Sequence, residues 1–163
     1  MRKNIIFFLH NLNAGGAEKN FINYANYLSK KNIDVKIICL SAKGILKKNI
    51  YKKVKIIDLN KKRLKYSIFT ILKNIISAKP DILFSSLLHI SLLLCLFKKM
   101  NIINAKLFLR PSNVILTNSI FDKNKPNFII IFLTKFFLRY ADLFFCISDN
   151  IFKELRLFKV PIN

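Results

Sequence analysis

The chain has 163 residues, 53% of them hydrophobic, which suits one domain with its own core and excludes a disordered segment. It has 29 Lys and Arg against 8 Asp and Glu, a net charge of +21. Such a charge indicates an anionic partner, such as nucleic acid, anionic lipid or a phosphorylated substrate. A compositional origin explains it equally well, because Ile, Lys, Asn and Phe are abundant and Trp is absent.

The three cysteines, Cys39, Cys95 and Cys146, lie in apolar runs and have no CxxC spacing. This pattern excludes a zinc motif and a disulfide framework, and it predicts buried free thiols in a reducing compartment. The apolar stretches 82–97 and 128–138 are shorter than the ~20 residues that a membrane span needs. We therefore predict a cytoplasmic chain whose contacts with a membrane are peripheral, on the inner face of the cell membrane.

Apolar runs of strand length alternate with segments whose apolar residues recur at helical spacing. In chain order we predict strand 4–9, helix 17–31, strand 35–40, loop 41–53, strand 54–59, helix 64–78, strand 82–85, helix 89–100, strand 106–109, helix 127–140, strand 142–147 and helix 148–158. Repeated β-α-β units with short connections predict a doubly wound, Rossmann-like α/β domain with a parallel sheet and right-handed crossovers.

Ligands of such a sheet bind beyond the carboxyl ends of its strands, so the loops after Leu9, Leu40, Ser85, Leu109 and Ile147 hold the candidate site residues. The first loop contains Gly15 and Gly16, which permit positive φ and a close backbone approach, and it opens a helix whose free N–H groups attract phosphate or hydroxyl. It matches neither the dinucleotide nor the NTPase glycine motif. A glycine turn with no ligand explains the same pattern.

Three segments together resemble family 4 glycosyltransferases of the GT-B fold. They are NIIFFLHNLNAGGAEKNFINYANYLSKKNIDVKIICL, KPDILFSSLLH and RYADLFFCISDNIFKEL, and they span most of the chain. The resemblance implies that residues 1–158 form the N-terminal, acceptor-side half of a GT-B architecture, that 159–163 begin the interdomain linker, and that the C-terminal donor-binding half is absent. It also implies transfer of a sugar, of the hexosyltransferase type, from a nucleotide-sugar to a glycan or lipid-linked acceptor in polysaccharide biosynthesis. No metal or other cofactor is expected, and the chain alone is expected to have little or no activity without a separate donor-binding chain or a C-terminal half of its own.

The resemblance and the loop positions together nominate six substrate-binding residues: Asn13, Gly15, Gly16, Glu18, Arg110 and Ser148. Three of them have structural alternatives, because Arg110 is one arginine of a basic chain, Glu18 complements a helix dipole and Ser148 suits an N-cap. His89 follows the fourth strand and is the one catalytic candidate, although polar packing explains it better, and His10 has similar standing.

Basic residues concentrate between the second strand and the second predicted helix. They are Lys43, Lys47, Lys48, Lys52, Lys53, Lys61, Lys62, Arg63 and Lys65. At about 1 kcal/mol for each cation near an anionic leaflet, this cluster suffices for peripheral binding, and a solvated charged face is the alternative. A non-catalytic membrane-docking or binding module of the same fold is thus the competing function. The sequence has no recognition helix, RNP-like motif or zinc motif, which argues against specific binding of nucleic acid.

Overall fold

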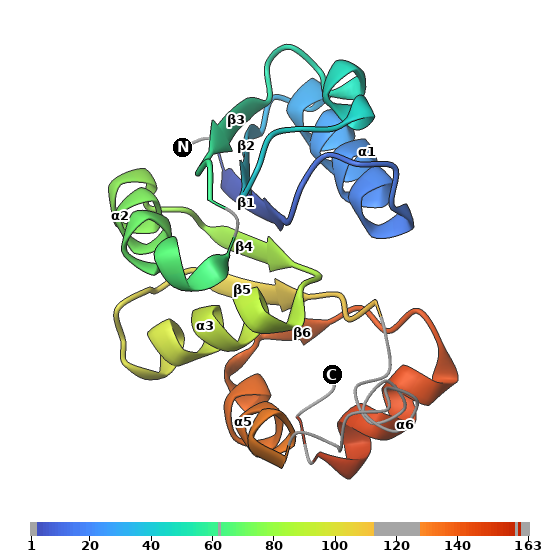
Figure 1. The fold of residues 1–163 in the computed structure, drawn as a ribbon, viewed down its shortest axis with the longest axis vertical. Coiled ribbons are helices and arrows are strands. Elements are labelled where there is room, and N and C mark those ends of the chain that lie inside the picture. The colour runs from blue at the N-terminus through green and yellow to red at the C-terminus, as the bar shows by residue number, and fades with distance from the viewer. Residues whose placement is uncertain (1–2, 62, 113–127, 159, 161–163) are drawn as a thin grey trace.

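The computed structural model describes residues 3–61, 63–112, 128–158 and 160 of the chain. Its elements in chain order are β1 (Asn4–Leu9), α1 (Gly16–Lys30), β2 (Asp34–Cys39), η1 (Ile45–Asn49), β3 (Lys55–Asp58), η2 (Leu64–Tyr66), α2 (Ile68–Ala78), β4 (Ile82–Ser85), α3 (Leu88–Lys99), β5 (Lys106–Leu109), α5 (Phe128–Phe137), η3 (Leu138–Tyr140), β6 (Leu143–Phe144) and α6 (Asp149–Leu157) (Figure 1). Here η marks a short 3₁₀ helix.

The six strands form one sheet in the order β3-β2-β1-β4-β5-β6, and every neighbouring pair is parallel. Strand β1 lies in the middle, hydrogen-bonded to β2 on one side and to β4 on the other. Its residues from Ile5 to Leu9 are all buried, as expected of an apolar strand covered on both faces. The predicted doubly wound parallel sheet is therefore confirmed.

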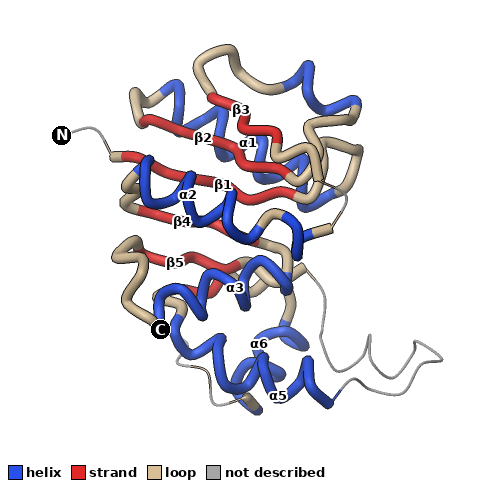
Figure 2. Tube along the Cα trace, turned by 60° about the vertical axis from the view of Figure 1, so that its left-hand side comes forward, coloured by secondary structure: helices blue, strands red, loops and turns tan. Residues whose placement is uncertain are grey.

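Alternate side chains of the strands enter two separate cores, one on each face of the sheet. Ile6 and Phe8 of β1 pack with residues of α2, α3, η3 and α6 on one face. Ile5, Phe7 and Leu9 pack with α1 and η1 on the other face. Figure 2 shows α2 and α3 on one side of the strands and α1 on the opposite side. The sheet thus separates two layers of helices.

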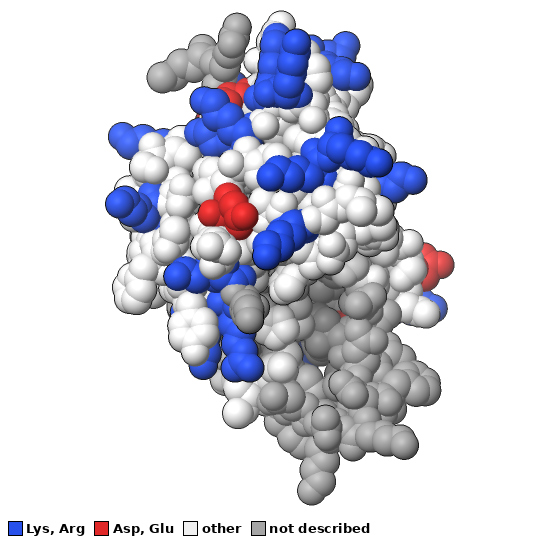
Figure 3. Space-filling view, turned by 45° about the horizontal axis from the view of Figure 1, so that its top comes forward, with Lys and Arg blue, Asp and Glu red and all other residues white. Residues whose placement is uncertain are grey.

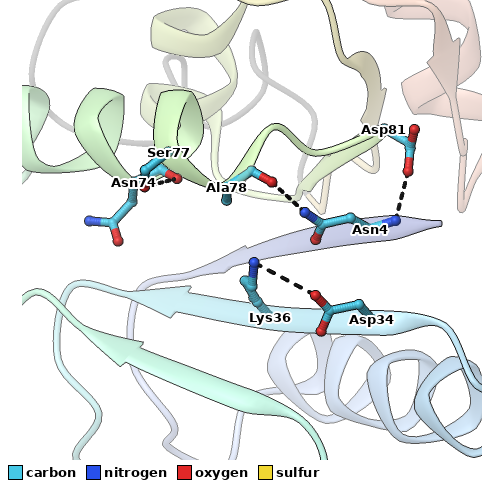
Figure 4. A network of polar contacts seen from close by, with 7 residues as sticks. All are labelled: Asn4, Asp34, Lys36, Asn74, Ser77, Ala78 and Asp81. Atoms are coloured by element: carbon cyan, nitrogen blue, oxygen red, sulfur yellow. Dashed lines mark hydrogen bonds and ion pairs between the residues drawn. The ribbon is translucent and has the colours of Figure 1, made fainter. Parts of the chain in front are cut away.

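Polar contacts fix the edges of the sheet. At its amino end, the backbone N–H of Asn4 donates to Asp81 at 2.7 Å and the Asn4 side-chain amide donates to the carbonyl of Ala78 at 2.6 Å, which ties β1 to the α2–β4 connection (Figure 4). At the β5–β6 edge, the Asp142 carboxylate accepts the backbone N–H of Leu107 at 2.6 Å and also pairs with Lys98. These contacts satisfy backbone and charged groups that the sheet leaves at its ends.

Several predicted boundaries were wrong. The helix predicted over 64–78 begins as the 3₁₀ turn η2, and α2 starts only after the buried Ser67. The loop predicted over 41–53 contains η1. Strand β6 is shorter than the predicted 142–147, because its partner β5 ends at Leu109, which pairs with Phe144. Ser148 caps α6 as predicted, its hydroxyl accepting the backbone N–H of Ile151 at 3.4 Å.

Two further expectations concern thiols and membranes. Cys39 and Cys95 are buried free thiols as predicted, whereas Cys146, which follows β6, is only half-buried. Within the described ranges no helix has both the length and the hydropathy needed to cross a bilayer. Residue 127 of the helix predicted over 127–140 and residues 159 and 161–163 of the predicted linker lie outside the described part of the chain.

Candidate functional site

The candidate site lies at the carboxyl edge of the sheet, next to β1. The chain leaves β1 toward α1 on one face and leaves the neighbouring β4 toward α3 on the opposite face. This divergence is the topological switch point at which open parallel sheets bind their ligands. The first loop, residues 10–15, and the start of α3 therefore flank the place where a ligand is expected.

Backbone hydrogen bonds hold the first loop rigidly against the loop that follows β2. Leu12 is fully buried, its N–H donates to the carbonyl of Lys43 at 3.0 Å, and its carbonyl accepts the N–H of Leu46 at 2.9 Å. Asn11 accepts the N–H of Asn13 at 2.9 Å through its side-chain oxygen. The exposed Asn13 is thus presented on a fixed turn rather than on a flexible segment.

The two glycines of this loop do not use the backbone freedom that the sequence predicted for them. Gly15 has φ −84° and ψ 150°, an extended conformation open to any residue, and Gly16 begins α1 without a positive φ. A Cβ at Gly16 meets no atom within 4 Å, whereas one at Gly15 falls 2.0 Å from the Glu18 carboxylate. Neither glycine therefore adopts the positive φ that its residue type permits, because α1 starts directly after an extended residue.

The start of α1 is nevertheless an open helix N-terminus. Among the described residues no side chain caps it by a hydrogen bond, so the first N–H groups of the helix face the carboxyl edge, and the Glu18 carboxylate lies near Gly15. Glu18 lies in the first turn of α1, where an acidic side chain complements the helix dipole. This position agrees with the structural role that the sequence analysis gave as the alternative to substrate binding. The same carboxylate competes with any anion for this N-terminus, whereas a sugar hydroxyl can donate to it.

Gly44 is the glycine that the fold requires, and the sequence analysis missed it. Its φ of +140° lies in the region that favours glycine, and a Cβ there falls 2.1 Å from the carbonyl carbon and oxygen of Leu12. The sequence contained a clue to this role, because the chain has only three glycines and one of them lies in the loop after the second strand. Gly44 acts by letting the two loops approach each other.

The structure separates the predicted residues into two groups. Arg110 lines a hollow of about 450 Å³ on the α1 side of the sheet, together with Phe7, Tyr24, Tyr27, Leu28, Phe84, Phe145, Cys146 and Ile147. None of the other predicted site residues lines that hollow. His89 is exposed in the first turn of α3, and the exposed His10 contacts the Asn11 amide at 3.1 Å. The first loop and α3 flank the switch point, and Arg110 lies beside it after β5.

A buried serine pair beneath α3 was also missed. The Ser91 hydroxyl donates to the Ser85 hydroxyl at 3.1 Å, and the Ser85 hydroxyl lies 3.4 Å from the Leu87 carbonyl. The N–H of Arg110 donates to the carbonyl of Ser85 at 2.9 Å, which links the ends of β4 and β5. These contacts position both the start of α3 and Arg110.

The thiols near the sheet are held protonated. Burial, with the nearby Asp58 carboxylate, raises the pKa of Cys39 to about 12, and burial raises the pKa of Cys95 to about 12 as well. Neither thiol is a nucleophile at neutral pH, because the thiolate is the reactive form. Among the described residues, no group of three or more His, Cys, Asp or Glu side chains is placed to hold a metal ion.

Comparison with solved structures places this architecture among the Rossmann-like halves of GT-B proteins. Sucrose-phosphate synthase from Thermosynechococcus elongatus matches 96% of this chain with a TM-score of 0.70 at 10% sequence identity, over 45% of its own length. A glycosyltransferase from Rickettsia africae matches 98% of this chain with a TM-score of 0.70 at 20% sequence identity. The match covers 41% of the length of that protein. Anabaena HepE in complex with UDP-glucose matches 97% of this chain with a TM-score of 0.66 at 13% sequence identity. The match covers 41% of the length of HepE.

At such low sequence identities the comparisons show a shared fold alone. This chain spans less than half the length of each of these solved chains. No family model matches the sequence, and neither does any curated protein. The GT-B fold expected from the resemblance is confirmed, and membership in family 4 stays a prediction.

We predict that Gly44→Ala lowers the free energy of unfolding by more than about 2 kcal/mol, because the added Cβ meets the Leu12 carbonyl at a φ that alanine rarely adopts. Gly16→Ala is the matched control, and its open position predicts a change within about 0.5 kcal/mol. Urea unfolding followed by circular dichroism measures both. Equal losses from the two variants would contradict the assignment of the loop contact to Gly44.

Proposed function

We propose that this chain is the acceptor-side domain of a glycosyltransferase of family 4. In this proposal it moves a sugar from a nucleotide-sugar donor to a glycan or lipid-linked acceptor, together with a donor-binding half. One observation carries the proposal: nearly the whole chain superposes on less than half of a protein named glycosyltransferase and of a protein solved in complex with UDP-glucose. We assign residues 1–158 to this domain and 159–163 to the start of a linker.

In the proposed reaction the acceptor hydroxyl oxygen bonds to the anomeric carbon of the donor sugar. The bond from that carbon to the nucleotide diphosphate breaks, and the acceptor proton passes to a base. The exposed His89 at the switch point is the candidate base, and the family resemblance implies no metal or other cofactor. Asn13 and the open N-terminus of α1 at Gly16 supply hydrogen bonds to acceptor hydroxyls, and Glu18 accepts one.

The remaining two residues have charge and capping roles in this proposal. Arg110 is half-buried at the end of β5, where its guanidinium meets a phosphate of the acceptor or of the departing nucleotide. Ser148 holds the start of α6 through its cap, so its contribution to the site is to position that helix. The donor-binding half supplies most contacts to the nucleotide, either on a separate chain or on a longer form of this one.

The test compares the chain alone with the chain joined to, or mixed with, a donor-binding half encoded next to it. We expect no transfer of radiolabelled sugar from the isolated chain and measurable transfer from the pair, because each half holds only one substrate. In the active pair, Arg110→Gln is expected to lower kcat/KM about tenfold or more, and Lys153→Gln on the exposed surface of α6 is the control.

Two outcomes would contradict the proposal. Full-rate transfer by the isolated chain would remove the need for a second half. Absence of transfer from every nucleotide-sugar by a stable complex of the two halves would remove the sugar-transfer function itself.

A second candidate function, a non-catalytic module that docks on a membrane, is favoured by the charge of residues 41–79. This stretch contains twelve Lys and Arg and one acid, Asp58. Figure 3 shows basic side chains spread over the described surface with few acidic ones between them. Tyr66 and Phe69 protrude from the same stretch, 62% and 87% exposed. Basic groups around exposed aromatic rings suit the inner face of an anionic membrane.

Vesicle flotation tests this second function. We expect binding to vesicles that contain anionic lipid and none to neutral vesicles, and Phe69→Ser is expected to weaken binding about tenfold by removing the inserted ring. Phe132→Ser, an exposed aromatic on α5, is the matched control. Equal binding to both kinds of vesicle, or equal loss from both variants, would contradict docking through this surface.

A further inference from the structure

A hollow of about 1040 Å³ lies at the amino edge of the sheet, opposite to the candidate site. It forms where the chain enters β1, β4 and β5. The backbone N–H of Asp81 donates to the carbonyl of Asn4 at 2.9 Å, and the N–H of Lys106 donates to the carbonyl of Asp81 at 2.8 Å. These bonds hold the starts of the three strands side by side. We call the space the amino-edge hollow.

Apolar side chains from α2 and from the turn before β5 line much of the amino-edge hollow. Ile75 and Ile76 come from the end of α2, and Ile102 and Ile103 come from the turn. Ile75 and Ile103 are buried, whereas Ile76 and Ile102 are 52% and 37% exposed. Isoleucine has no hydrogen-bonding group in its side chain. This lining therefore favours an alkyl chain over a sugar, whose hydroxyls it would leave unpaired.

Three lysines, Lys3, Lys79 and Lys106, line the same hollow. Asp81 is the one acid among the lining residues that the structure describes, and its carboxylate already accepts the N–H of Asn4 at 2.7 Å (Figure 4). None of the three lysines forms a salt bridge with another described residue. An anion in the hollow therefore gains charge pairing that the described part of the chain does not supply.

The backbone at Lys79 is an independent sign that a cation is selected at this place. Lys79 ends α2 in the left-handed conformation, with φ 44° and ψ 60°, and its N–H donates to the carbonyl of Ile75 at 2.9 Å. The other described residues with positive φ, glycine apart, are asparagines, namely Asn32, Asn60 and Asn101. Asparagine tolerates this conformation well and lysine does not. A strained residue that keeps a charge in a hollow points to binding.

We propose that the amino-edge hollow binds a monomeric amphiphile with one alkyl chain and a terminal carboxylate, the chemistry of a free fatty acid. The alkyl chain lies on the isoleucine side chains, and the carboxylate meets the lysines. Both parts are required, because exposed ion pairs alone contribute little and the buried chain supplies the rest. The lipid-linked acceptors of the proposed function carry a sugar on their head group, so they lack this terminal anion. The inference does not depend on that function.

Three probes separate the two halves of the proposed ligand. Laurate has the chain and the carboxylate, acetate has the carboxylate alone, and dodecyl maltoside has the chain with a neutral head. Isothermal titration calorimetry with the full chain is run below the concentrations at which laurate and the maltoside form micelles. We expect laurate to bind at least about ten times more tightly than either of the others, because each of them lacks one half of the match.

Lys79→Asn separates the charge from the backbone strain. Asparagine suits the left-handed conformation, so the midpoint of urea unfolding is expected to stay or rise, while laurate binding weakens about threefold to fivefold. The double variant Lys79→Asn/Lys106→Gln is expected to weaken binding about tenfold or more. Lys73→Gln, at an exposed position of the same helix outside the hollow, is the matched control and is expected to leave binding unchanged.

A second pair of variants tests the apolar lining. Ile76→Ser is expected to weaken laurate binding about fivefold by removing apolar contact with the chain. Ile45→Ser is the matched control, because Ile45 is 66% exposed in η1 and does not line the hollow. Circular dichroism confirms that each variant is folded. Backbone amide shifts on adding laurate are expected in residues 75–82 and 102–108.

Four outcomes would overturn the inference. They are equal binding of laurate and dodecyl maltoside, equal loss from the hollow variants and their controls, laurate-induced shifts outside the hollow, and displacement of laurate by a lipid-linked sugar. The last would assign the hollow to the acceptor. None of these measurements depends on sugar transfer, so the proposed function stands or fails separately.

Discussion

The pairing of β1 on both sides is the constraint on which the rest of the structure depends. Its hydrogen bonds to β2 and β4 place it at the centre of the sheet, and its side chains fill the cores of both faces. The chain must therefore leave β1 in one direction and return on the far side of it at β4. That reversal creates the switch point, so the position of the candidate site follows from the burial of a single strand.

The same topology explains why the described helices are distributed unevenly over the two faces of the sheet. Helices α2, α3 and α6, with η3, cover one face, while α1 and η1 cover the opposite face beside β1 and β2. The first loop is braced by the loop at Gly44, which holds the carboxyl edge of the sheet in place beside β1. A hollow lined by Phe7, Phe84 and Phe145 lies on the α1 side of the sheet.

Much of this fold could be predicted because local pattern decides it. Strands 4–9, 82–85 and 106–109 match the structure at both ends, since short apolar runs bounded by turns leave little choice. Ser148 was predicted as a cap because capping depends on nearby residues alone. Gly44 was missed because its conformation is imposed by Leu12, 32 positions earlier in the chain. Arg110 lines a hollow that Gly16 does not line. This arrangement depends on packing between distant segments, which the spacing of apolar residues along the chain does not encode.

The central claim is that acceptors bind at the carboxyl edge around the β1–β4 switch point. Backbone amide shifts during titration with glycan and lipid-linked sugars test it most directly, because each amide reports its own position. The account predicts shifts concentrated in residues 11–18 and 86–89, with residues 79–82 at the amino edge unchanged. Shifts confined to the amino edge, or to the basic stretch 41–79, would contradict it.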